Sequence, residues 1–152
     1  MRSLYLVSAA IAALMAVPAS ARAQAGSSDA VAELLRDAST GATAKGYRQA
    51  PRVFDGRSVM GMLPGGGIVV LEANLRAGVR YTVVAVCDAD CVDLDLRAHA
   101  PGADDVLDED VSTDNVPVLT FTATVDGPHP LSVIMSECRA DLCRFGLRVL
   151  AQ

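Results

Sequence analysis

Tyr81–Ala98, YTVVAVCDADCVDLDLRA, is the stretch around which we expect the fold to be organised. Its first part, Tyr81 to Val86, is almost continuously apolar and rich in β-branched residues, which is typical of a strand covered on both sides. In its second part the apolar residues at even positions from 92 to 98 alternate with polar ones, which is typical of a strand with one solvated face. The pattern predicts two strands joined as a hairpin at Asp88-Ala89-Asp90.

The chain contains four cysteines, an even number, and their spacing predicts disulfides at two turns. Neither pair has the CxxC spacing of thiol oxidoreductases or of paired zinc-ribbon knuckles, so a redox or metal role is the less favoured alternative. Because each pair brackets a predicted hairpin turn, the expected disulfides are Cys87 with Cys91 and Cys138 with Cys143.

Residues 1–23 have the pattern of a signal peptide that is cleaved before Gln24. An early Arg2 is followed by an apolar core, by the helix breaker Pro18 and by the small residues Ala21 and Ala23 at the cleavage site. A membrane anchor is the alternative, but the apolar core is shorter than the ~20 residues that a spanning helix needs. We therefore expect a periplasmic or secreted protein with no membrane span after cleavage.

The net charge argues against two classes of partner, nucleic acids and anionic lipid surfaces. The signal contains two of the 13 basic residues and none of the 18 acidic ones, which leaves the mature chain with a net charge of −7. Such a surface repels nucleic acids and anionic lipids.

Residues 24–52 are predicted to form a short helix and a linker. Val31, Leu34, Leu35 and Ala38 fall at helical spacing, and Ser28 is the expected N-terminal cap. A helix of about three turns is marginal alone in water, so it must dock on the domain, meet a partner or fray. The segment from Gly41 to Pro51 has the small and polar composition of a linker.

Residues 53–152 are predicted to form one β domain of about seven short strands separated by tight turns. Alternation from Leu119 to Val125 is the clearest strand pattern, and two later strands are expected to form a final hairpin with Cys138 and Cys143 at its tip. The acidic stretch from Pro101 to Asn115 is expected to be a long surface loop. These features indicate an all-β fold, an antiparallel β-sandwich, with the short helix at its N-terminal side.

From about residue 61 to residue 150 the strand order resembles the bacterial pre-peptidase C-terminal domain, a jelly-roll-like β-sandwich. The features that match are Leu75-Arg76-Ala77-Gly78 followed by Tyr81, the strand Asp93-Leu94-Asp95-Leu96, and the Gly127 turn before the penultimate strand. His129-Pro130-Leu131 departs from the family, in which an aromatic residue is usual after that turn. The chain carries no peptidase domain, so the resemblance bears on fold more than on function.

The only candidate ligand cluster is a group of aspartates in and after the first cysteine turn, Asp88, Asp90, Asp93 and Asp95. A calcium ion takes six to eight oxygen ligands, which such carboxylates, backbone carbonyls and water could supply. The spacing is not that of an EF-hand, although some members of the family that the chain resembles bind calcium near this end of the sandwich. The alternative is a solvated acidic face that discourages pairing between sheet edges.

Sequence motifs for catalysis are weak. The two histidines, His99 and His129, are expected to be solvated at a strand end and in a turn, and no GxSxG motif accompanies them. Gly65-Gly66-Gly67 lies between two strands without a P-loop lysine and is expected to be a turn.

The favoured hypothesis is therefore an exported, non-catalytic β-sandwich module that binds a protein or a cell-envelope polymer, with no cofactor. A calcium-stabilised structural domain is the second hypothesis. An enzyme of unrecognised type is the third.

Overall fold

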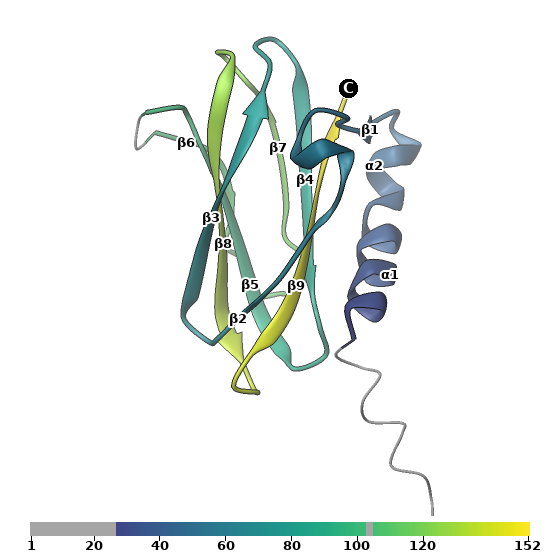
Figure 1. Ribbon diagram of the computed structural model, residues 1–152, viewed down its shortest axis with the longest axis vertical. Coiled ribbons are helices and arrows are strands. Elements are labelled where there is room, and N and C mark those ends of the chain that lie inside the picture. Colours follow the sequence, from purple (N-terminus) through teal and green to yellow (C-terminus); the bar gives the residue numbers. More distant parts are fainter. Residues whose placement is uncertain (1–26, 103–104) are drawn as a thin grey trace, which may run out of the picture.

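A computed structural model describes residues 27–102 and 105–152 of the chain (Figure 1). The predicted signal peptide, residues 1–23, lies outside the described residues. The described part begins with two consecutive helices, α1 (Ser28–Ala38) and α2 (Thr40–Ala44), and continues to Ala151 as β-strands, with a short 3-10 helix, η2 (Phe54–Gly56), after the first strand.

The strands form two antiparallel sheets that lie face to face (Figure 1). Sheet A has the order β1-β9-β4-β7, and β2 also pairs with β9; its strands are β1 (Arg48–Gln49), β2 (Val59–Leu63), β4 (Arg80–Cys87), β7 (Val118–Thr122) and β9 (Cys143–Ala151). Sheet B has the order β3-β8-β5-β6, with β3 (Gly67–Leu75), β5 (Cys91–His99), β6 (Val106–Asp110) and β8 (Gly127–Cys138).

Strand pairing is nested along the chain. β2 pairs with β9, β3 with β8, β4 with β7 and β5 with β6, all antiparallel. From β2 to β9, the first strand pairs with the last, the second with the second to last, and so on inward. This nested pairing is the topology of a jelly roll. The structure thus confirms the predicted antiparallel, jelly-roll-like sandwich.

Both predicted hairpins are wrong. β4 belongs to sheet A and β5 to sheet B, so the turn at Asp88-Ala89-Asp90 carries the chain from one sheet to the other. The turn between β8 and β9 crosses between the sheets in the same way. Alternating apolar residues show which face of a strand is buried but not which strand is its hydrogen-bonding partner, so a crossing turn has the same local pattern as a hairpin.

The acidic stretch from Pro101 to Asn115 is not a loop throughout, because it contains β6, the edge strand of sheet B. Two of its carboxylates bridge to the neighbouring edge of sheet A. Asp108 Oδ2 accepts a hydrogen bond from the backbone N–H of Thr120 at 2.7 Å, and Asp110 Oδ2 accepts one from Val118 at 3.0 Å. These aspartates occupy free N–H groups of edge strand β7, so those groups are not available to pair with a strand of another chain.

The main core lies between the sheets and contains the inward side chains of both, among them Leu94, Leu96, Leu119, Leu131 and Leu147, each fully buried. β7 ends earlier than predicted, at Thr122, and Val125 is 47% exposed in the turn that follows. The alternating pattern extends beyond the strand because this turn is itself partly apolar.

Helix α1 packs on the outer face of sheet A, over β4 and β9 (Figure 1). Val31 and Leu35 are fully buried there against Val84, Val86 and Leu150. Sheet B covers the inner face of β4 and α1 covers its outer face. This accounts for the almost continuous apolar run from Tyr81 to Val86.

A close approach of backbone to helix makes this docking possible. A Cβ atom on Gly146 of β9 would lie 3.0 Å from Val31 Cγ1 and 3.3 Å from Leu35 Cδ2, so only glycine leaves room for the helix at this position without displacing it. The helix is capped by Ser27 instead of Ser28, since Ser27 Oγ accepts the N–H of Ala30.

The segment with a linker-like composition is also packed on the domain. It contains α2 and β1, and Tyr47 is only 5% exposed, in the cluster beneath α1. The aromatic ring of Tyr47, the pairing of β1 with β9 and the buried Ala50 together anchor the segment, although most of its other residues are small or polar.

Candidate binding surface

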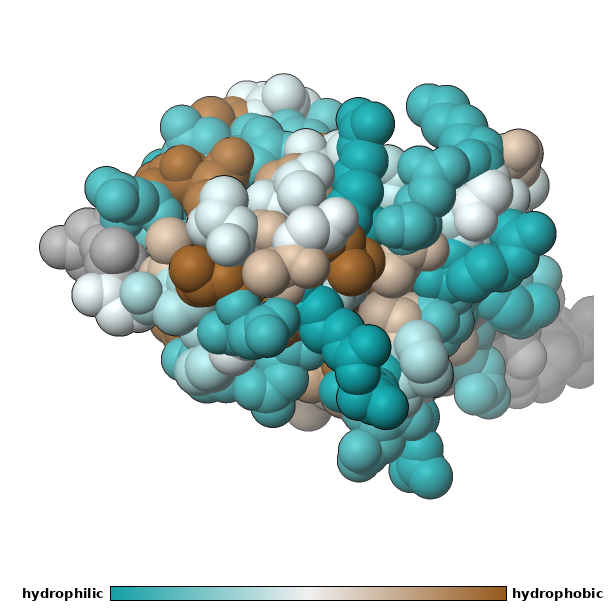
Figure 2. Space-filling model, turned by 90° about the horizontal axis from the view of Figure 1, so that it is seen from above, coloured by the Kyte–Doolittle hydropathy of each residue, from teal (hydrophilic) through white to brown (hydrophobic). Residues whose placement is uncertain are grey.

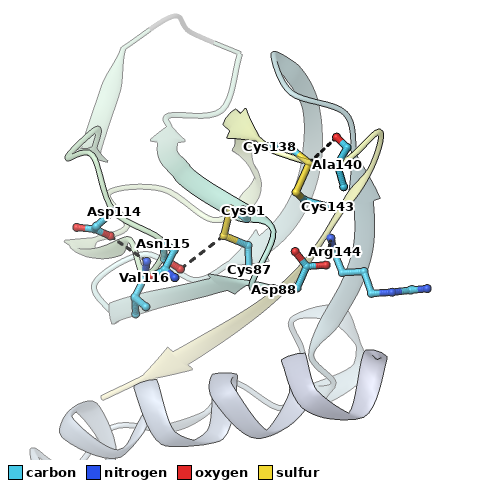
Figure 3. The surroundings of a disulfide bond; sticks show 10 residues. All are labelled: Cys87, Asp88, Cys91, Asp114, Asn115, Val116, Cys138, Ala140, Cys143 and Arg144. Carbon is cyan, nitrogen blue, oxygen red and sulfur yellow. Dashed lines mark hydrogen bonds between the residues drawn. A yellow bond between two sulfur atoms is a disulfide. The ribbon is translucent and has the colours of Figure 1, made fainter. Parts of the chain in front are cut away.

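Both disulfides lie at one end of the sandwich, and each joins a strand of sheet A to a strand of sheet B (Figure 3). The sulfur atoms of Cys87 and Cys91 are 1.97 Å apart, and those of Cys138 and Cys143 are 2.06 Å apart. These are the pairs that the turn spacing predicts. Cys91 and Cys138 are direct neighbours in the register of β5 and β8. The two disulfides therefore lie side by side and cross-link the two sheets at this end of the molecule.

The two cysteine turns are also joined to each other by hydrogen bonds. Asp88 is 3% exposed, and its Oδ2 atom accepts the backbone N–H of Arg144 at 2.9 Å, while its own N–H donates to the Arg144 carbonyl at 3.0 Å (Figure 3). In addition, the N–H of Arg139 donates to the carbonyl of Asp90 at 2.9 Å. The carboxylate of Asp88 therefore has a structural partner in the fold.

The structure does not bring together the four aspartates that were predicted to bind calcium. The Asp88 carboxylate is directed to Arg144, Asp90 lies exposed in the turn, and Asp93 and Asp95 lie on the outer face of β5. Within residues 27–102 and 105–152, no group of three or more acidic, histidine or cysteine side chains is placed to hold a metal ion. Calcium binding stays a prediction.

Asp93 and Asp95 form an acidic group with Glu137, which is the register partner of Asp93 on β8. Burial and the neighbouring charge of Asp95 raise the pKa of Asp93 above its ordinary value, and the charge of Glu137 adds to this effect, whereas a hydrogen bond from the Asp114 backbone opposes it. Ser136 donates a hydrogen bond to Asp95 Oδ2. One carboxylate oxygen of Asp93 and one of Asp95 are buried without a hydrogen-bond partner, so the group has unused acceptor capacity.

The outer face of sheet B also exposes aliphatic side chains. Ile68 and Val70 on edge strand β3 are 61% and 53% exposed, and Ile134 of β8 lies directly beside Ile68 in the register. Asp95 is the partner of Ile134 on the other side, so one row across three strands reads Ile68, Ile134, Asp95. The face is therefore apolar at Ile68 and Val70 of β3 and acidic at Asp93 and Asp95 of β5.

Sequence reasoning identified the acidic half of this face but missed the apolar half. The alternation from Ile68 to Leu75 puts Val69, Leu71, Ala73 and Leu75 on one face of the strand and leaves Ile68 and Val70 on the other. A polar residue is expected at outward positions of a sandwich strand. Two aliphatic residues at such positions were the signal that could have revealed the surface.

The opposite side of the molecule, over the outer face of sheet A, has a different surface. A groove of about 590 Å³ lies between the helices and strands β4 and β7, and residues such as Ala42, Tyr47, Thr82 and Thr120 line it. Lys45 and Arg80 also line the groove. Its floor is mixed, because Val84 and Val118 lie there beside Thr82 and Thr120, whose hydroxyl groups are 3.1 Å apart in a hydrogen bond.

His129 is not solvated as expected. It lies within β8, is fully buried, and its Nδ1 atom donates to the carbonyl of Gly127 at 3.0 Å. Pro128 and Pro130 suggested a turn, but β8 begins at Gly127, and the strand turns the two prolines outward and the histidine inward. His99 is half-buried at the end of β5.

Seen from the end at which the C-terminus lies, hydrophobic residues occur in small groups between hydrophilic ones (Figure 2). A hollow of about 350 Å³ is lined there by Val53, Leu75, Val79 and Tyr81 among others. The Tyr81 hydroxyl accepts the N–H of Arg76 at 3.0 Å, which fixes the turn between β3 and β4 beside it. Of the helices in the described ranges, none has the length and apolar character needed to cross a membrane.

No protein-family model matches this chain, and the search of curated proteins gave no match. Among solved structures, the chain is similar to PliG from Aeromonas hydrophila, a periplasmic inhibitor of g-type lysozyme, with 16% identity over 63% of this chain and 85% of that one and a TM-score of 0.49. It is also similar to the pre-peptidase C-terminal domain of a collagenase from Bacillus anthracis. That match has 17% identity over 61% of this chain and 87% of the other, with a TM-score of 0.48. The second protein belongs to the family that the sequence resembles.

Proposed function

We propose that this chain is an exported, non-catalytic β-sandwich module that binds a protein through the outer face of sheet B. The observation that carries the proposal is an asymmetry between the two sheets. Helix α1 covers the outer face of sheet A, whereas within the described residues no element covers the outer face of sheet B, where Ile68 and Val70 are exposed.

Exposed aliphatic side chains favour a protein partner over a polymer of the cell envelope. Covering an Ile or Val side chain fully contributes about 1.5–3 kcal/mol, and both side chains are about half exposed, so each has roughly half of that contribution still available. Another apolar surface can realise it, whereas a hydrated polysaccharide chain offers little apolar surface. Among the aromatic residues, Tyr47, Tyr81, Phe121 and Phe145 are buried, so none of these four provides a stacking platform.

Rigidity supports the same proposal. The sheets are joined by two disulfides at one end, which are stable in an oxidising compartment such as the periplasm or the exterior. A surface built on two cross-linked sheets loses little conformational entropy on binding, and this lowers the cost of association.

A crosslinking experiment in intact cells tests the proposal. A photoreactive residue at position 70 is compared with one at position 34, because Leu34 of α1 is 47% exposed on the opposite side of the molecule. We expect a protein adduct at position 70, lost in an Ile68→Ser variant, and none at position 34.

The purified mature protein provides the second readout. As bait, the Ile68→Ser/Val70→Ser variant should lose the partner while Leu34→Ser retains it, and denaturation curves should show all three proteins folded. Equal recovery of the partner by both variants, or equal loss, would refute a binding face on sheet B.

A further inference from the structure

We infer that the protein bound by the outer face of sheet B is cationic, and that it places basic side chains against Asp93 and Asp95 while it covers Ile68 and Val70. This inference rests on the proposed function and specifies the class of partner. It starts from the register, which places apolar and acidic side chains in one row across β3, β8 and β5. Adjacent strands are about 4.8 Å apart, so Ile68 and Asp95 are separated by about 10 Å, well within the footprint of one partner protein.

The charge of this face is strongly one-sided. The outer face of sheet B carries one basic side chain and a larger number of acidic ones. The acidic residues are Glu72, Asp93, Asp95, Glu109 and Glu137. The basic residue, Arg97, is already paired with Glu109, Nε to Oε2 at 2.9 Å. In the part of the chain that the structure describes, Asp93, Asp95 and Glu137 therefore have no ion-pair partner.

The carboxylates are also incompletely hydrogen-bonded. One oxygen of Asp93 and one of Asp95 lack a donor, although both atoms are shielded from solvent. A lysine or arginine from a partner would contact the exposed part of these half-buried carboxylates and form a charge-assisted pair there. Its positive charge would also offset the repulsion from Asp95, which after burial is the main cause of the raised pKa of Asp93.

Basic side chains gather on the opposite side of the molecule. Arg36 and Lys45 belong to the helical segment, and Arg144 and Arg148 lie on the outer face of β9. Arg148 is close enough to Arg36 for their mutual repulsion to help lower its pKa, after the larger effect of burial. Helix α1 also carries Asp29, Glu33 and Asp37, so that side of the molecule is mixed in charge, and a cationic protein is attracted more strongly to the one-sided face of sheet B.

Two labelled peptides of equal length test the inference, one composed of lysine and leucine and the other with glutamate in place of lysine. Binding to the full mature protein is measured by fluorescence anisotropy at low and at physiological salt. We expect the lysine peptide to bind, the glutamate peptide not to bind, and the affinity to fall as salt rises.

Two variants with the same charge change separate a site from general attraction. Asp93→Asn/Asp95→Asn should weaken binding by roughly tenfold, as the loss of two interface charges does. Glu33→Gln/Asp37→Asn, on the exposed side of α1, should change it less than about twofold, the effect of distant charges screened by salt. Ile68→Ser/Val70→Ser should also weaken binding, because the apolar half takes part.

Equal weakening by the two charge variants would overturn the inference, since only net charge would matter. Unchanged binding in Asp93→Asn/Asp95→Asn would overturn it as well. If the cellular adduct at position 70 persisted in that variant, the proposed function would stand and the cationic partner alone would be rejected. Sedimentation of the protein alone must show a monomer, because self-association that depends on Asp93 and Asp95 would make a second copy the occupant and contradict a separate partner.

Discussion

Asp93 and Asp110 are two carboxylates of sheet B whose ionisation affects folding in opposite directions. Burial and Asp95 raise the pKa of Asp93, so its charged form is disfavoured in the folded state. Burial acts on Asp110 in the same sense, but the N–H groups of Val118 and Ser112 outweigh it and lower its pKa. The two side chains therefore make opposite contributions to the pH dependence of stability.

We expect Asp93→Asn to stabilise the protein at pH 7 by about 0.5 kcal/mol, a typical size for partly exposed charges, and Asp110→Asn to destabilise it. The charge of Asp93 lowers the free energy of unfolding by its full amount above the folded-state pKa. This destabilisation disappears as the pH falls to the ordinary pKa of an aspartate. The stabilisation from Asp110 is present above its ordinary pKa and is lost as the pH falls through its lower folded value. Urea denaturation of the three proteins from pH 7 to about pH 2, where carboxyl groups are protonated, should show both differences shrinking. Differences that are independent of pH would contradict the assignment.

Calcium binding can be tested at the same residues. The four predicted aspartates are not placed as one group within the described residues, and Asp88 Oδ2 is held by the backbone N–H of Arg144. We therefore expect any rise in melting temperature with millimolar calcium to be abolished in Asp93→Asn/Asp95→Asn and retained in Asp88→Asn. A site at a hundredfold excess of calcium over its dissociation constant stabilises the fold by about 2.7 kcal/mol, which thermal unfolding detects easily. A rise that requires Asp88 would support the four-aspartate site instead.

At the scale of elements, α1 is part of the folded domain. Its two neighbouring leucines differ sharply, because Leu35 is fully buried on sheet A while Leu34 is 47% exposed. The helix is too short to be stable alone, so the contacts of Val31 and Leu35 with β4 and β9 hold it. A docked helix was one of the alternatives that the sequence left open.

Leu35→Ala should cost about 2–5 kcal/mol, the range for a buried leucine, and Leu34→Ala less than about 0.5 kcal/mol, as for an exposed position. Chemical denaturation of both variants measures the difference. Gly146→Val is a third variant that acts from the sheet side, since its side chain would displace Val31 and Leu35. If Leu35→Ala unfolded at the same denaturant concentration as the wild type, the helix would not be docked in solution.

At the scale of the whole molecule, the disulfides join the two sheets at one end, where the turns of both pairs are linked through Asp88 and Arg144. At the other end, the turn between β3 and β4 is held by hydrogen bonds such as that from Ala77 N–H to Asp126 Oδ1 at 2.8 Å. Covalent linkage at a single end means that separation of the sheets is opposed there most strongly.

Removing either disulfide by paired Cys→Ala substitution should cost about 2 kcal/mol, because a loop of five or six residues removes little entropy from the unfolded chain. Removing both should cost more than the sum, since each bridge keeps the shared end closed when the other is lost. Chemical denaturation of the two variants with one disulfide and of the variant with none gives the coupling free energy between the two disulfides. Strict additivity would show that the two turns act independently despite their contact.

The sequence by itself determined the local properties of this protein. Alternation at every second residue showed where most strands run and which side chains face inward, because side chains on a strand point to opposite faces in turn. The spacing of Cys87 with Cys91 and of Cys138 with Cys143 was enough to predict the pairs, since a turn of three or four residues brings its ends within disulfide reach whether it closes a hairpin or crosses between sheets.

Only the tertiary structure decided which strands are neighbours. The pairing of β2 with β9 and of β3 with β8 joins segments at opposite ends of the domain, and no local pattern encodes a partner so distant in sequence. That pairing also decides the environment of single residues. It buries Asp88 against Arg144 and His129 inside β8, and it leaves Ile68 and Val70 exposed beside Asp95, because burial depends on what a neighbouring element covers.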